Sequence, residues 1–84
     1  MEIKSGERRN FWGYITPLRL LEQAFQTVGM KVDFILSLDS STEFKSLDIK
    51  TKSDEYHILL DRSPRETVEK AAFLLASGKE KKHG

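Results

Sequence analysis

Two helix-start signals divide this 84-residue chain and leave room for three strands between them. Thr16-Pro17 and Ser63-Pro64 each place a hydroxyl residue before a proline, an order favoured where a helix begins. Glu66 stands three residues after the serine, at the spacing of a capping box. Apolar residues then recur at helical spacing after each signal. We therefore expect one helix over residues 16–29 and a second over 64–77.

Between these helices the apolar residues alternate with polar ones, which is the pattern of strands with one buried face. The predicted strands cover residues 31–38, 43–52 and 56–60. In the middle segment the alternation fails once after Phe44. That failure predicts a β-bulge near Lys45-Ser46.

The N-terminal segment has extended character on both sides of a turn signal. Ser5-Gly6-Glu7 separates a short piece, residues 2–4, from an aromatic-rich piece, residues 8–15. Aromatic residues favour strands, and glycine between two extended pieces favours a hairpin. We therefore expect a short N-terminal β-hairpin.

These elements predict one α+β domain over residues 1–84, a two-layer sandwich in the order (β-hairpin)-α-β-β-β-α. An antiparallel meander sheet would be covered on one face by the two helices. Gly78 would end the second helix before a flexible polar tail, residues 79–84. The expected core consists of Leu18, Leu21, Phe25, Val28, Val32, Phe34, Leu36, Ile49, Tyr56, Ile58, Leu60, Val68, Ala72 and Leu75.

Charge is nearly balanced, since 14 lysine and arginine residues stand against 13 acidic residues, for a net charge of +1. Any nucleic-acid site must therefore come from local segregation of basic residues. Cysteine is absent, which excludes disulfides and cysteine-based zinc sites. The two histidines join no catalytic motif, and no glycine-rich phosphate loop occurs. We expect neither enzyme activity nor a cofactor nor a metal.

Basic residues stand beside aromatic residues and beside a helix start. Arg8 and Arg9 precede Trp12, and arginine next to exposed aromatic rings suits phosphate contact together with base stacking. Arg62 and Arg65 flank the start of the second helix, where backbone N–H groups favour phosphate. The simpler interpretation is a solvated surface, with Trp12 in the core. The candidate nucleic-acid-binding residues are Arg8, Arg9, Lys45, Lys50, Lys52, Arg62 and Arg65.

The sheet face away from the helices would carry a few apolar residues. Ile35 and Leu59 have the parity of that open face, and His57 lies near them. They form either a patch for self-association, and so a homodimer, or scattered surface residues that need no explanation.

The α-β-β-β-α order over residues 16–78 resembles the double-stranded RNA-binding domain. That family carries a lysine-rich motif at the start of its last helix, which grips phosphates. This chain has only Arg65 and Lys70 there, with Glu66 and Glu69 between them. The resemblance implies RNA binding, but the motif departs from the family pattern.

A second resemblance is carried by Phe11-Trp12-Gly13-Tyr14, Gln23, Phe25, Gly29-Met30, Arg62-Ser63 and Ala76-Ser77. In these residues the chain resembles the C-terminal double-wing domain of MotA, the middle-promoter transcription factor of T-even phages. Wings contact DNA in that family, and the resemblance implies that the N-terminal hairpin and the middle strands would be the wings here.

Small accessory proteins of such phages include inhibitors of host defence systems. The resemblance therefore implies a non-enzymatic RNA-binding phage protein that inhibits a host factor, such as a toxin endoribonuclease, in the bacterial cytoplasm. A protein–protein interaction module and a regulator that binds double-stranded DNA are the alternatives. No apolar run is long enough to span a membrane, so we expect no membrane partner.

Overall fold

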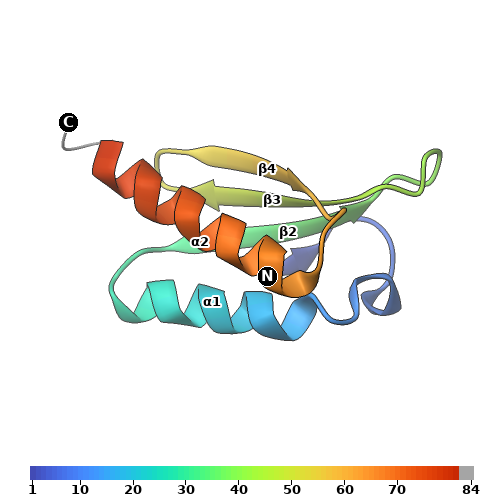
Figure 1. Ribbon diagram of the computed structural model, residues 1–84, viewed down its shortest axis with the longest axis horizontal. Helices are drawn as coiled ribbons and strands as arrows, with labels where there is room; N and C mark the ends of the chain where they lie inside the picture. Colours follow the sequence, from blue (N-terminus) through green and yellow to red (C-terminus); the bar gives the residue numbers. More distant parts are fainter. Residues whose placement is uncertain (82–84) are drawn as a thin grey trace.

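The computed structural model describes residues 1–81, and it describes their side chains as far as Ser77. One layer is a four-stranded sheet, and both helices lie on one face of it (Figure 1), which confirms the α+β class. The strands are β1 (Glu2–Ile3), β2 (Val32–Leu38), β3 (Lys45–Thr51) and β4 (Glu55–Leu59), in that spatial order, and the helices are α1 (Ile15–Thr27) and α2 (Pro64–Lys81).

The sheet is mixed, because β1 pairs parallel to β2 while the pairs β2–β3 and β3–β4 are antiparallel. The β2–β3 register runs without interruption from Val32 opposite Thr51 to Leu38 opposite Lys45. The bulge predicted near Lys45-Ser46 is therefore wrong. Phe44 precedes β3 and is 65% exposed, so it belongs to the loop and not to the strand alternation.

The predicted N-terminal hairpin is also wrong. After β1 the chain stays beside β2, since the Lys4 N–H donates to the Leu36 carbonyl at 2.8 Å. Arg8–Phe11 then forms a 3₁₀-helix, η1, in place of a second strand. This turn brings Phe11 into the core, where it is fully buried, and burying a large aromatic side chain outweighs its local strand preference.

Helix α1 begins at Ile15 with Tyr14 as its N-cap, two residues before the predicted cap Thr16. Its end agrees with the prediction, because Gly29 has a φ of 83°. The Met30 N–H donates to the Phe25 carbonyl at 2.9 Å, which satisfies a carbonyl in the last turn.

Ser63 caps α2, because its Oγ accepts a hydrogen bond of 3.2 Å from the Glu66 N–H. The Glu66 carboxylate turns toward Arg62 and does not complete the capping box. The helix continues through Gly78 to Lys81, so the predicted end at Gly78 is wrong; glycine inside a helix costs only about 1 kcal/mol. The rest of the predicted tail, 82–84, lies outside the described residues. No helix within 1–81 is both long and apolar enough to cross a membrane.

The core lies between the sheet and the two helices. Most predicted core residues are buried or half-buried, but Val28 is 68% exposed because it lies beyond the last turn of α1. Four buried hydrophobic residues were missing from the prediction, namely Phe11, Ile15, Leu47 and Ala71, and so was the buried polar residue Thr67. Leu47 shares the core face of β3 with Ile49, and Ala71 lies on the buried stripe of α2 with Leu75.

Candidate nucleic-acid interface

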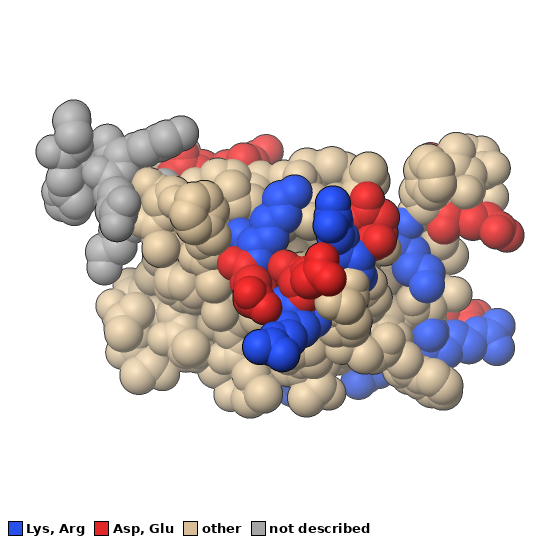
Figure 2. Space-filling model, viewed as in Figure 1, with Lys and Arg blue, Asp and Glu red and all other residues tan. Residues whose placement is uncertain are grey.

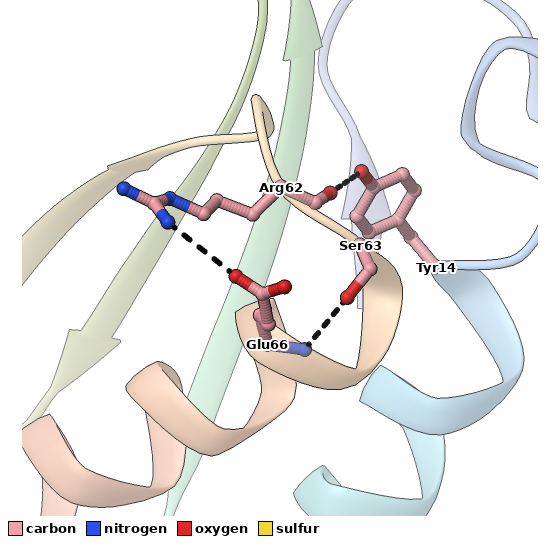
Figure 3. Close-up of polar contacts among 4 residues, drawn as sticks. All are labelled: Tyr14, Arg62, Ser63 and Glu66. Carbon is pink, nitrogen blue, oxygen red and sulfur yellow. Dashed lines mark hydrogen bonds and ion pairs between the residues drawn. The ribbon is translucent and has the colours of Figure 1, made fainter.

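The segment before α1 is fastened to the start of α2. The Tyr14 hydroxyl donates a hydrogen bond to the backbone carbonyl of Arg62 (Figure 3). A Cβ added at Gly13, where φ is 92°, would lie 3.4 Å from Cγ of Pro64, so the backbone there packs closely against α2. Burial, followed by the nearby charge of Asp61, raises the pKa of the Tyr14 phenol. These contacts bring the N-terminal arginines and the start of α2 to the same end of the molecule.

Trp12 lies on the surface next to this junction. Its side chain is 76% exposed, whereas the preceding Phe11 is fully buried. The η1 turn therefore directs one of two adjacent aromatic residues into the core and the other into solvent. Of the two interpretations open for Trp12, the structure supports the surface position, and an exposed indole can stack on a base.

Three of the arginines face a neighbouring glutamate. The ion pairs are Arg62 with Glu66 at 3.5 Å, Arg65 with Glu69 at 3.3 Å and Arg9 with Glu7 at 2.6 Å. Figure 2 shows acidic side chains among the basic ones over this face. Because exposed ion pairs contribute only about 0–1 kcal/mol, a phosphate can displace these carboxylates, but the glutamates reduce the local positive charge.

The structure separates the predicted basic residues into two groups along the sheet. Arg62 and Arg65 lie at the start of α2, where the junction is, and Arg8 and Arg9 lie in η1, the turn that precedes Tyr14 in the chain. Lys45 lies at this end too, since its carbonyl accepts a hydrogen bond of 2.9 Å from the Leu60 N–H. Lys50 and Lys52 lie at the other end of β3, a distance of roughly 20 Å for a seven-residue strand.

On the open sheet face, Lys50 is opposite Asp33 on one side and Glu55 on the other. Acidic residues on both neighbouring strands therefore flank this lysine. Among the residues that the described strands turn toward this face, His57 has the only aromatic ring, and its Nδ1 lies 2.5 Å from the Asp48 carboxylate. The open face therefore provides no set of rings on which successive bases could stack. Lys50 and Lys52 are thus not brought together with the arginines.

The predicted self-association residues do share the open face, but they form no continuous apolar patch. Ile35 is opposite Asp48, whose carboxylate lies 2.5 Å from Nδ1 of His57. Leu59 is opposite Ser46. Polar side chains on β3 therefore separate Ile35 from Leu59.

An open groove of about 610 Å³ runs between β4 and the first turns of α2. Arg62 and Lys70 line it together with Asp61 and Glu66, so its charges balance. Thr67 also lines it, and the buried Oγ1 of this residue has no hydrogen-bond partner among the described residues. Within the described part of the chain no group of three histidine or acidic residues could hold a metal ion.

Part of this geometry could be read from the sequence. The i, i+4 spacing of Arg62 with Glu66, and of Arg65 with Glu69, is a local signal for ion pairs on a helix. No local signal indicates the bond between Tyr14 and Arg62, because it joins residues 48 positions apart.

The chain matches no family model, no curated protein and no solved structure. The assignment of the candidate interface is therefore argued from the positions of its residues in this structure alone.

Proposed function

We propose that this protein binds single-stranded nucleic acid, RNA in preference to DNA, and that it acts without catalysing a reaction. The observation that carries the proposal is the exposed Trp12 beside the junction of Tyr14 with Arg62. One aromatic ring with arginines on either side can stack on a base and contact the adjoining phosphates.

Single strands suit this surface better than duplexes do. A duplex-binding protein needs a wide basic face, whereas the net charge is +1 and the arginines face glutamates. The N-terminus of α2 offers limited help, because the Ser63 hydroxyl already accepts the Glu66 N–H. Phosphate contacts would therefore come mainly from the side chains of Arg8, Arg62 and Arg65.

By this proposal the protein acts by occupying a host factor, in the manner of the small phage inhibitors described above. A toxin endoribonuclease fits, because a protein that holds the nuclease or its RNA would block cleavage without chemistry of its own. The regulator of double-stranded DNA receives less support, because the N-terminal segment forms η1 in place of a hairpin wing.

The test is fluorescence anisotropy of labelled single-stranded RNA, single-stranded DNA, duplex RNA and duplex DNA at low and physiological salt. We expect single-stranded RNA to bind most tightly, with affinity falling as salt rises. The protein's one tryptophan is Trp12, so quenching of intrinsic fluorescence should accompany binding. No binding to any of the four at tens of micromolar would contradict the proposal.

A further inference from the structure

Strand β4 forms one edge of the sheet, and its hydrogen bonds show which backbone groups face outward. The Thr51 N–H donates to the Asp54 carbonyl and the Leu60 N–H donates to the Lys45 carbonyl, each at 2.9 Å. In an antiparallel pair, hydrogen-bonded and non-hydrogen-bonded residues alternate. Tyr56 and Ile58, at even positions between these bonds, therefore bond to β3.

The odd positions of β4 then direct their backbone groups away from the sheet. Glu55, His57 and Leu59 are all exposed, and no described residue makes a backbone hydrogen bond to this outer edge. Exposed edges are usually blunted by charged side chains, above all lysine, by proline or by a bulge. Residues 55–59 contain no lysine and no proline, Glu55 at the start of the strand is their one acidic residue, and their register with β3 is unbroken.

The other edge of the sheet differs, because β1 has only two residues. A very short edge strand offers few groups for pairing. Among the described strands, β4 is therefore the edge that can accept another strand.

We propose that β4 pairs antiparallel with β4 of a second copy of this chain, about a two-fold axis at His57. Glu55 of one copy then lies opposite Leu59 of the other, and the two His57 residues face each other. In this register every outward N–H and C=O of the three odd residues gains a partner. The two sheets join into one sheet that continues across both copies.

The charges around the edge suit a second copy better than a strongly charged partner. The groove beside β4 balances Arg62 and Lys70 against Asp61 and Glu66, so two such surfaces meet without net repulsion. Opposite Glu55 stands an apolar residue and not another acid. A pairing of five-residue strands buries less than the roughly 1,000 Å² of a stable interface, so we expect a weak, concentration-dependent dimer.

Amide hydrogen exchange over a range of protein concentrations, together with sedimentation velocity, tests this pairing. The amides of Tyr56 and Ile58 should be protected at every concentration, because they bond to β3. The amides of Glu55, His57 and Leu59 should gain protection only as the dimeric fraction rises with protein concentration. Fast exchange at these three amides in a dimeric sample, or no dimer at millimolar concentration, would overturn the proposal.

Variants at the axis sharpen the test. His57→Pro removes an outward N–H without removing a bond to β3, and should weaken dimerisation at least tenfold, whereas His57→Ala should dimerise like the parent. If the proline variant fails to fold by circular dichroism, His57→Lys places two cations face to face and should weaken the dimer to a similar degree. Asp33→Lys, on the same face but on β2, is the matched control. A dimer lost in Asp33→Lys and kept in His57→Lys would contradict edge pairing.

Discussion

The Tyr14 hydroxyl donates a hydrogen bond to the backbone carbonyl of Arg62, and so links the cap of α1 to the residue before the cap of α2. This contact holds the exposed Trp12 near the arginines of α2. Removing the hydroxyl therefore affects stability and the candidate interface together.

Tyr14→Phe should lower the free energy of unfolding by about 0.5–1.5 kcal/mol, the usual net contribution of one hydrogen bond. Urea denaturation followed by circular dichroism measures the change. Tyr56→Phe is the control, because the Tyr56 hydroxyl has no hydrogen bond to a described residue, and it should change stability little. Equal losses in the two variants would indicate that the bond to Arg62 contributes nothing of its own.

The loop between β2 and β3 should lose stability in acid through Asp39. Hydrogen bonds from the side chain and backbone of Ser41 lower the pKa of this carboxyl below its ordinary value of 3.8. A lowered pKa means that the ionised form stabilises the fold above about pH 3.8, and that this contribution disappears as the pH falls through the pKa of the folded state.

The difference in melting temperature between the parent and Asp39→Asn should therefore be largest near neutral pH and shrink below pH 4. Ser41→Ala should move the Asp39 pKa back toward 3.8 in an NMR titration. A pKa that stays equally lowered in Ser41→Ala would rule out the Ser41 hydroxyl as the main cause and leave the backbone N–H.

Thr67→Val should stabilise the protein. Thr67 is 2% exposed and its Oγ1 has no hydrogen-bond partner among the described residues. Removing this hydroxyl from water therefore destabilises the folded state without a compensating hydrogen bond. Replacing the hydroxyl by a methyl group of similar size should raise the free energy of unfolding by about 1 kcal/mol. Thr67→Ser, which keeps the hydroxyl and loses the methyl group, should destabilise. The melting temperatures of the two variants, compared with that of the parent, test this prediction. Destabilisation in both variants would show that the hydroxyl has a partner.

Trp12→Ala should weaken binding of single-stranded RNA by about 5- to 150-fold, because stacking contributes about 1–3 kcal/mol per base. Phe44→Ala is the matched control, since Phe44 is also an exposed aromatic residue but lies in the β2–β3 loop. Fluorescence anisotropy measures both. If both variants bind like the parent, Trp12 does not stack on a base.

The double variant Arg62→Glu with Arg65→Glu should weaken binding. It should also reduce the slope of the logarithm of the binding constant against the logarithm of salt concentration by about 1.4, the value for two phosphate contacts on a single strand. Lys50→Glu with Lys52→Glu changes the charge equally at the other end of β3, and should leave the affinity nearly unchanged. If the lysine variant loses more affinity than the arginine variant, the nucleic acid binds at the end of β3 that carries Lys50 and Lys52.

Local patterns in the sequence determined most of the secondary structure. The alternation of Val32, Phe34 and Leu36 with polar residues, and the helix signals at Ser63 and Gly29, act within a few residues, so they are visible in the chain itself. The exposed ion pairs of α2 follow from i, i+4 spacing for the same reason.

Only the tertiary structure decided the partners of the N-terminal segment. Phe11 and Trp12 have the same strand preference, yet one is buried and the other exposed, because η1 fits a single ring into the space between the helices and the sheet. The pairing of β1 with β2 and the bond from Tyr14 to Arg62 join residues far apart in sequence, and no local pattern encodes such contacts. The candidate interface depends on these long-range contacts, so its position follows from the fold and not from the order of the residues.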